Sequence, residues 1–218
     1  MKVQKAILAV VVGSSLVFTA CKCEKKDNIA AAPVTETETS NTSDITTSTS
    51  KLDADGNYIY DIGQNIDLAL PGGSSITVGE NSSENKLFTM LNDANFTISD
   101  DKTQGWVTLD RVYFATGKSE LTTNSEAQVA NLTTLLAAFP TASVKVGGYT
   151  DSTGDAAVNK RVSTERAKSI ADKLIAGGVD ASRIESEGYG AEHFVCPAND
   201  TDECKAQNRR VDIRITKK

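Results

Sequence analysis

The stretch from residue 143 to residue 176, SVKVGGYTDSTGDAAVNKRVSTERAKSIADKLIA, decides the fold of this chain. Valines at alternate positions predict a strand over Ser143–Tyr149. A turn rich in capping residues follows over Thr150–Asp155, and the apolar spacing beyond it predicts a long helix over Ala156–Ala176. A glycine pair at 177–178 is typical of a helix C-terminus. The stretch is therefore a strand–turn–helix unit.

Strands and helices are also predicted on both sides of this unit. The further elements are strands over Trp106–Phe114, Ile184–Gly188 and Val211–Thr216, and a helix opened by the capping box Thr123-x-x-Glu126. The last strand alternates apolar and polar residues, so we expect it to be half-buried. The order β-α-β-α-β-β predicts an α+β fold over residues 106–218, a sandwich of one sheet with both helices packed on one face.

The long helix has an unusual inward stripe. At about 100° per residue, one stripe is apolar in its C-terminal half and polar in its N-terminal half. The stripe consists of Ala156, Asn159, Ser163, Arg166, Ala167, Ile170 and Leu174. A semi-buried arginine needs a carboxylate partner, and the nearest candidate for Arg166 is Asp151, in the turn before the helix. Asp151 would also gain from the free amides and the dipole of the helix N-terminus.

Two interpretations of Asp151 and Arg166 remain open. The two side chains could pair with each other and so stabilise the start of the helix. Alternatively, they could line a pocket that holds one anion, one cation and free backbone amides. Such a pocket suits a zwitterion, because the carboxylate would bind an ammonium group and the guanidinium would bind a carboxylate through two hydrogen bonds.

Five motifs in this part of the chain resemble those of the OmpA-like C-terminal domain family, which includes OmpA tails, MotB tails and the Pal lipoproteins. They are VYFATGKSEL at 112–121, Gly148-Tyr149-Thr150-Asp151, Asn159-x-x-Val162-Ser163-x-x-Arg166-Ala167, Gly188-Tyr189-Gly190 and Asn208-Arg209-Arg210-Val211. The resemblance covers about residues 106–218. It implies noncovalent binding of peptidoglycan through the diaminopimelate of its stem peptide.

The resemblance also implies roles for individual residues. Asp151 and Arg166 would hold the charged groups of diaminopimelate. The residues that would line or support the same site are Asn159, Thr150, Ser163 and Arg209. Thr116-Gly117 stand where many members have Phe-Asp, a departure that affects a secondary contact with the peptide stem.

The N-terminus has the layout of a secretory signal. A basic start and an apolar core over Ala6–Phe18 precede Thr19-Ala20-Cys21. The last three residues resemble the end of a lipobox, where bacterial lipoproteins are cut and acylated, although Phe18 stands at a position that prefers an aliphatic residue. We therefore expect a lipoprotein signal peptide over 1–20 and acylation of Cys21, for example with palmitate. A simple cleaved signal and a retained membrane anchor are the alternatives.

Two further segments precede the C-terminal domain. Residues 21–51 predict a disordered tether, because 11 of the 16 residues from Thr35 to Ser50 are Ser or Thr. Residues 52–105 predict a small β-rich module of unknown role. Its expected elements are strands over Asn57–Asp61, Ile66–Leu70 and Ser75–Val78, with a turn at Pro71-Gly72-Gly73 between the last two. A helix capped by Ser83 and reaching Asn92 should follow, and then a last strand around Phe96 and Ile98. Within it, Asp53-x-Asp55-Gly56-Asn57 departs from the EF-hand pattern and predicts a plain Asp-Gly turn.

Charge and composition disfavour several classes of protein. The chain has 23 basic and 29 acidic residues, but residues 105–218 carry 15 of each and so lack the basic face of a nucleic-acid binder. One histidine, His193, leaves little for a zinc site or a His-based triad, so we expect no metal or cofactor. Cys196 and Cys204 predict a disulfide around seven intervening residues, with two free thiols as the alternative.

The sequence therefore predicts a non-enzymatic lipoprotein of the outer membrane whose periplasmic C-terminal domain tethers the membrane to peptidoglycan. A wall-acting enzyme is one alternative, but Ser152 and Ser163 lack a plausible histidine partner. A MotB-like stator component is another, and it would need a spanning helix longer than Ala6–Phe18.

Overall fold

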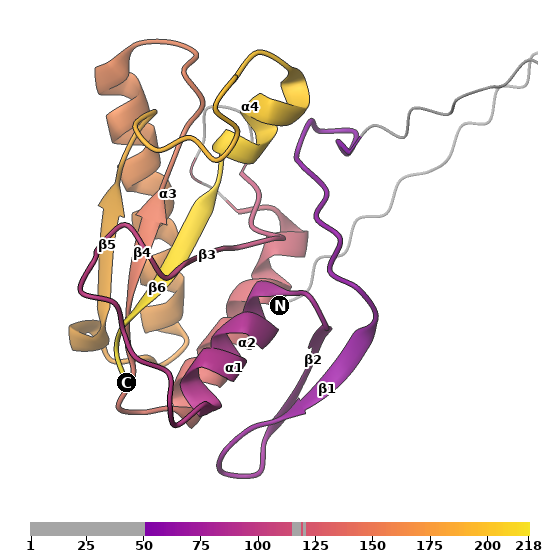
Figure 1. Ribbon diagram of the computed structural model, residues 1–218, viewed down its shortest axis with the longest axis vertical. Helices are drawn as coiled ribbons and strands as arrows, with labels where there is room; N and C mark the ends of the chain where they lie inside the picture. Colours follow the sequence, from indigo (N-terminus) through magenta and orange to yellow (C-terminus); the bar gives the residue numbers. More distant parts are fainter. Residues whose placement is uncertain (1–50, 115–118, 120) are drawn as a thin grey trace, which may run out of the picture. The chain divides into compact units, whose positions relative to one another are not determined.

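The computed structural model describes residues 51–114, 119 and 121–218 (Figure 1). The predicted signal peptide, the lipidation site Cys21 and the predicted tether lie outside the described residues, as does Thr116-Gly117. From residue 51 onward the described residues belong to one compact unit.

Within the described residues, a mixed four-stranded sheet forms the centre of the C-terminal domain. Its strands are β3 (Trp106–Thr108), β4 (Ser143–Gly148), β5 (Ile184–Gly188) and β6 (Val211–Lys217). They follow the order β3-β6-β4-β5, in which β6 runs antiparallel to both neighbours and β4 runs parallel to β5. A parallel pair needs a long crossover connection, and the long helix predicted after β4 provides it. The predicted α+β fold class is confirmed.

Two long helices pack with this sheet and supply much of the core. α2 (Thr123–Ala138) lies between α3 (Ala156–Ala176) and α1 (Ser83–Asn92), and α3 packs across β4 and β5 (Figure 1). The largest fully buried side chains here are Leu132, Leu135, Ile170, Leu174 and Ile213. A 3-10 turn (Ala181–Arg183) leads into β5, and the short helix α4 (Asp202–Asn208) precedes β6.

The predicted module before the sheet forms a hairpin and a helix. β1 (Asn65–Ala69) pairs antiparallel with β2 (Ser75–Gly79), and the turn between them uses Gly72 and Gly73 at positive φ, as the Pro-Gly-Gly sequence predicts. Ser82, one residue earlier than predicted, caps α1 by accepting a hydrogen bond from the amide of Asn85.

Two predicted strands of the module do not form. Asn57–Asp61 makes one isolated bridge, between Leu52 and Tyr58, and the Tyr58 carbonyl accepts from the hydroxyl of Tyr113. The segment around Phe96 and Ile98 also has no strand among the described residues. Shortly after it, the carbonyls of Ser99 and Gln104 accept from Arg214. In both segments side chains take carbonyls that a strand ladder would use.

A buried polar network joins α1 to the residues that follow β3. Glu84 is fully buried and forms an ion pair with Arg111. The amide nitrogen of Gln128, in α2, lies 2.9 Å from Glu84 Oε2 and 2.8 Å from Asp110 Oδ1. Asp110 also accepts from the backbone amide of Ser83, at 2.6 Å. The buried side chains of Glu84, Asp110 and Gln128 therefore each have a hydrogen-bond partner in another of these three segments.

Three predictions about the C-terminal domain are wrong in detail. β3 ends at Thr108 rather than Phe114, because the amides of Arg111 and Tyr113 bond to side chains of α2 instead of a neighbouring strand. α2 begins after Thr122, which makes no side-chain cap bond, so the predicted capping box at Thr123 does not form. Ala156, in the first turn of α3, is exposed.

The last strand is also more buried than its alternating pattern predicts. Asp212 and Arg214, expected to face solvent, are buried like the apolar residues between them. Arg214 donates to carbonyls of the loop before β3, and Asp212 pairs with Arg210. The loop before β3 covers this face of β6, so the polar side chains are buried with partners rather than solvated.

Candidate ligand-binding site

A cavity of about 500 Å³ lies where the turn after β4, the first half of α3 and the end of α4 meet. The predicted site residues that line it are Asp151, Arg166, Asn159, Thr150 and Arg209. Ser163 does not line the cavity. The structure therefore brings together five of the six residues that the family resemblance implied for the site.

Asp151 lies in the turn between β4 and α3, with its side chain 10% exposed. One carboxylate oxygen accepts from the amide of Thr153 at 2.8 Å, and the other accepts from Arg209 Nη1 at 2.8 Å. Burial raises the pKa of this carboxyl, but the bonds from Arg209 and Thr153 outweigh burial, so the net pKa is lowered. Asp151 is therefore held as a carboxylate.

The helix start is capped by a different residue. Asp155 is the N-cap of α3 and accepts from the amides of Ala157 and Val158. Asp151 does not take the amides of the first helical turn, contrary to the expectation from its position. Its carboxylate instead faces the cavity.

Arg166 comes from the middle of α3 and is 7% exposed. Its guanidinium carbon lies 5.1 Å from the centre of the Phe114 ring, within the range of a cation–π contact. Burial lowers the pKa of Arg166, the neighbouring Arg209 lowers it further, and Asp151 opposes both. Asp151 forms an ion pair with Arg209, and Arg166 lines the same cavity.

Asn159 and Ser163 fix the backbone around the cavity. The Asn159 amide donates to the carbonyl of Thr153 at 3.1 Å, which holds the turn against the helix. Ser163 Oγ accepts from the amide of Gly190 at 2.9 Å. Gly148 needs to be glycine, because a Cβ there would lie 2.1 Å from the carbonyl oxygen of Ser163. The polar half of the predicted stripe thus seats α3 against the ends of β4 and β5.

Two buried polar atoms of the cavity wall have no hydrogen-bond partner in the part of the chain that the structure describes. They are Thr150 Oγ1 and Arg210 Nη1. Arg210 lies 3.8 Å above the ring of Tyr149 and forms an ion pair with Asp212. Sequence reasoning missed Arg210 as a lining residue, although the Asn-Arg-Arg-Val motif contains it.

Sequence reasoning also missed the segment Asp53–Tyr60 as part of the cavity wall, since it lies far from the family motifs in the sequence. Five of its residues, at 55–58 and 60, line the cavity. Arg209 Nη2 donates to the carbonyl of Gly56 at 3.0 Å. Asp53 accepts from the amides of Asp55 and Asn57, which confirms the predicted turn. No local signal in this segment points to the cavity.

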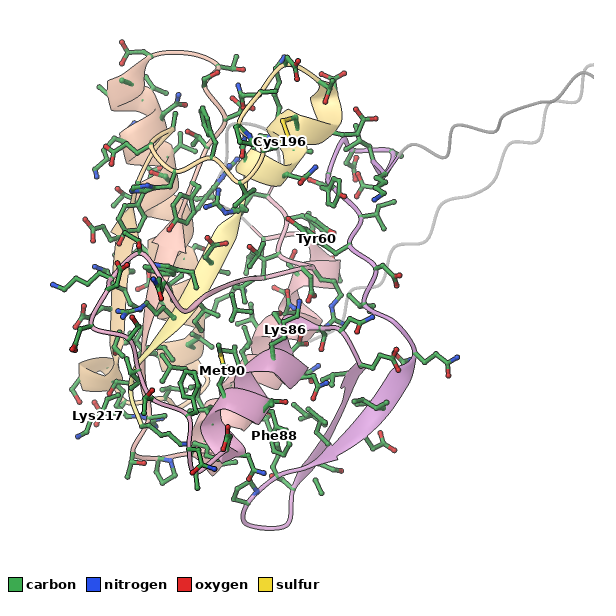
Figure 2. The ribbon with its side chains drawn as sticks, viewed as in Figure 1. Tyr60, Lys86, Phe88, Met90, Cys196 and Lys217 are labelled. Carbon is green, nitrogen blue, oxygen red and sulfur yellow. A yellow bond between two sulfur atoms is a disulfide. The ribbon has the colours of Figure 1, made fainter. Side chains whose placement is uncertain are left out.

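A disulfide braces the α4 side of the cavity. Cys196 and Cys204 are bonded, with their Cα atoms 5.2 Å apart, as predicted (Figure 2). The side chain of Asn208 accepts from the amides of Val195 and Cys196, and Asn208 immediately precedes Arg209. Among the described residues, no group of His, Cys, Asp and Glu is arranged to hold a metal ion, and no helix has the length and apolar character needed to cross a membrane.

The fold and the cavity define an α+β domain with a pocket lined by charged side chains. Residues 113–209 match the OmpA family. Probable lipoprotein YiaD of Escherichia coli is 49% identical over 82 residues, which are 38% of this chain and 37% of the relative. Outer membrane protein Omp38 of Acinetobacter baumannii is 36% identical over 107 residues, 49% of this chain and 30% of the relative.

Other relatives include a named peptidoglycan-binding protein. ArfA of Mycobacterium tuberculosis is 44% identical over 80 residues, covering 37% of this chain and 24% of the relative. The peptidoglycan-associated lipoprotein of Burkholderia pseudomallei aligns with 24% identity and a TM-score of 0.47, over 58% of this chain and 99% of that one. The chain spans about a third of the length of the first curated relatives it matches.

Proposed function

We propose that this chain is a bacterial envelope lipoprotein whose OmpA-like domain binds peptidoglycan noncovalently through the diaminopimelate of the stem peptide. The observation that carries this proposal is that a carboxylate, Asp151, and two guanidinium groups, Arg166 and Arg209, line one cavity. The names of two relatives support it, since one is a peptidoglycan-binding protein and another a probable lipoprotein.

The charges of the cavity suit a ligand with an ammonium beside a carboxylate. Asp151 would accept from the ammonium, and Arg166 would donate to the carboxylate. Arg209 is already hydrogen-bonded to Asp151, so it lies within reach of the same ligand. Because the domain as a whole carries equal numbers of acidic and basic residues, recognition would depend on these local charges and not on long-range attraction.

We propose binding without turnover. A hydrolase needs a paired acid and base or an activated nucleophile. The lowered pKa of Asp151 suits a group that binds a cation and does not suit a general acid. The proposal also includes acylation of Cys21, which would anchor the chain in the outer membrane and place the domain in the periplasm.

Co-sedimentation with purified sacculi tests the binding site. We expect the parent to sediment with sacculi, whereas Asp151→Ala and Arg166→Ala remain in the supernatant with an unchanged circular dichroism spectrum. Asp172→Ala is the matched control, because Asp172 is an exposed aspartate paired with Lys168 on the outer side of the same helix. If both cavity variants sediment like the parent, the site assignment is wrong.

Two further measurements test the other parts of the proposal. Palmitate labelling should mark the parent and not Cys21→Ser. Incubation of the parent with sacculi should release no soluble muropeptides, and their release would contradict a role without turnover.

A further inference from the structure

The cavity has a wall that the family match does not include. The match begins at residue 113, whereas the segment Asp53–Tyr60 contributes five lining residues. Within this segment the side chains of Tyr58 and Tyr60 form an edge-to-face pair with ring centres 4.8 Å apart. Ile59, between them, does not line the cavity and is 51% exposed. The segment therefore turns its two aromatic rings inward and its aliphatic residue outward.

Three sets of hydrogen bonds fix this segment in place. Asp53 closes its turn by accepting from the Asn57 amide at 2.8 Å and from the Asn57 side chain at 2.9 Å. The hydroxyl of Tyr113 donates to the Tyr58 carbonyl at 2.9 Å. Arg209 donates to the carbonyl of Gly56 as well as to Asp151. The same guanidinium thus connects the segment to the proposed diaminopimelate site.

The cavity wall has unused hydrogen-bonding capacity. Among the described residues, Thr150 Oγ1 and Arg210 Nη1 are buried without partners, although buried polar atoms normally have them. Tyr60 is labelled in Figure 2, on the side of its segment that faces the four-stranded sheet. A ligand group that enters the cavity could satisfy one or both of these atoms.

We propose that Asp53–Tyr60 is a second wall of the ligand site and that it binds the stem peptide beyond its diaminopimelate. This inference rests on the proposed function. The two tyrosines present apolar ring faces with polar hydroxyls, and the Asn57 amide can both donate and accept. These groups suit a short peptide of small side chains whose backbone amides need partners. The zwitterionic end would remain with Asp151 and Arg166.

Two probes separate the two parts of the site. One is free meso-diaminopimelate, and the other is a tripeptide that ends in diaminopimelate. The full chain and its variants are titrated with each probe by calorimetry. We expect Tyr58→Ala and Tyr60→Ala to weaken tripeptide binding at least tenfold and to leave binding of free diaminopimelate within twofold of the parent. Ile59→Ala, an outward substitution in the same segment, should bind both probes like the parent.

A second pair of variants covers the case in which a tyrosine variant does not fold. Asp53→Ala removes the carboxylate that closes the turn at the cavity, whereas Asp61→Ala removes a similar carboxylate, bonded to the amide of Gly63 at 3.0 Å, outside the cavity lining. We expect the first to weaken tripeptide binding selectively and the second to change neither probe.

Three results distinguish failure of this inference from failure of the proposed function. If the segment variants bind the tripeptide like the parent, or lose both probes equally, the segment is not a peptide-binding wall. If the parent binds neither probe, the proposed function itself is wrong. A selective loss of the tripeptide supports both.

Discussion

Two neighbouring arginines, Arg209 and Arg210, each form an ion pair with an aspartate, and the two pairs differ in their surroundings. Arg209 binds Asp151 at the cavity, where the side chains are 36% and 10% exposed. Arg210 binds Asp212 with side chains 6% and 5% exposed, and its guanidinium stacks on the ring of Tyr149. Adjacent residues at the start of a strand point in opposite directions. The same pair of chemical groups can therefore place its carboxylate at the cavity, as at Asp151, or in the interior, as at Asp212, while both arginines line the cavity.

The pKa values of the two aspartates shift in opposite directions. At Asp212, burial raises the pKa and outweighs the opposing effects of Arg210 and Thr108. At Asp151, the bonds from Arg209 and Thr153 outweigh burial, so the pKa is lowered. The comparison indicates that hydrogen bonds dominate at the cavity and desolvation dominates in the interior.

The largest effect on stability is expected from Asp212→Ala. Removing one partner of a buried ion pair leaves an uncompensated charge, which costs about 3–5 kcal/mol of unfolding free energy. Urea denaturation of the full chain measures this value. If Asp212→Ala is no more destabilising than Asp151→Ala, the distinction between an interior pair and a cavity pair does not hold.

Breaking the disulfide is the next largest change. The Cys196–Cys204 bridge closes a short loop, so its loss should reduce the unfolding free energy by about 2–3 kcal/mol. The unfolding midpoint of the parent should fall on addition of reductant, whereas a Cys196→Ser/Cys204→Ser variant should not respond. Because Cys196 is hydrogen-bonded to Asn208, which precedes Arg209, sacculus binding should weaken as well. Normal binding by the reduced chain would show that the disulfide is not needed to position Arg209 at the cavity.

Asp151→Asn should have a small effect on stability and a large one on binding. Arg209 is more than one-third exposed and keeps its bond to the Gly56 carbonyl, so the lost pair is worth about 1 kcal/mol or less. Urea denaturation and sacculus co-sedimentation are measured on the same preparation. A loss of several kcal/mol would show that Asp151 belongs to the fold in the way that Asp212 does.

The smallest expected effect is the pH dependence of the difference in unfolding free energy between the parent and each aspartate variant. The folded pKa of Asp151 is below the ordinary value of 3.8, so its contribution to stability is present above pH 3.8 and is lost as the pH falls through the folded value. The stability difference between parent and Asp151→Asn should therefore be constant from about pH 8 to pH 5 and shrink below about pH 4.

For Asp212, whose folded pKa is raised, the parent should lose stability relative to Asp212→Asn as the pH rises above 3.8. Urea midpoints at several pH values test both signs, and parallel profiles for the two variants would contradict the comparison.

Periodicity explains which parts of the fold are predictable. The bounds of α3 and β5 are as predicted, and the polar stripe of Asn159, Ser163 and Arg166 is buried. These features depend on residues within a few turns or positions of one another, so the local pattern contains them. The family motifs likewise place Asp151 and Arg166 in one cavity.

Contacts between distant residues explain what the sequence does not predict. The partner of Asp151 is 58 residues away, and Arg209 reaches Gly56 across 153 residues. Burial of the outer side of β6 likewise depends on carbonyls of Ser99 and Gln104, more than 100 residues earlier. None of these contacts produces a periodic pattern in the sequence. A strand in which polar and apolar residues alternate has the same pattern whether water or a loop covers its polar face.

The position of the Asp53–Tyr60 segment has a mechanical consequence. The described chain begins at Lys51, whose carbonyl accepts from Ile59, and the Leu52–Tyr58 bridge lies directly after it. A pulling force applied to the chain before Lys51 reaches this bridge and the Gly56–Arg209 bond before it reaches the β1–β2 hairpin. Tension on the N-terminal side is thus borne first at the wall of the cavity, so a load on the chain would act on the same few bonds that hold the proposed ligand site together.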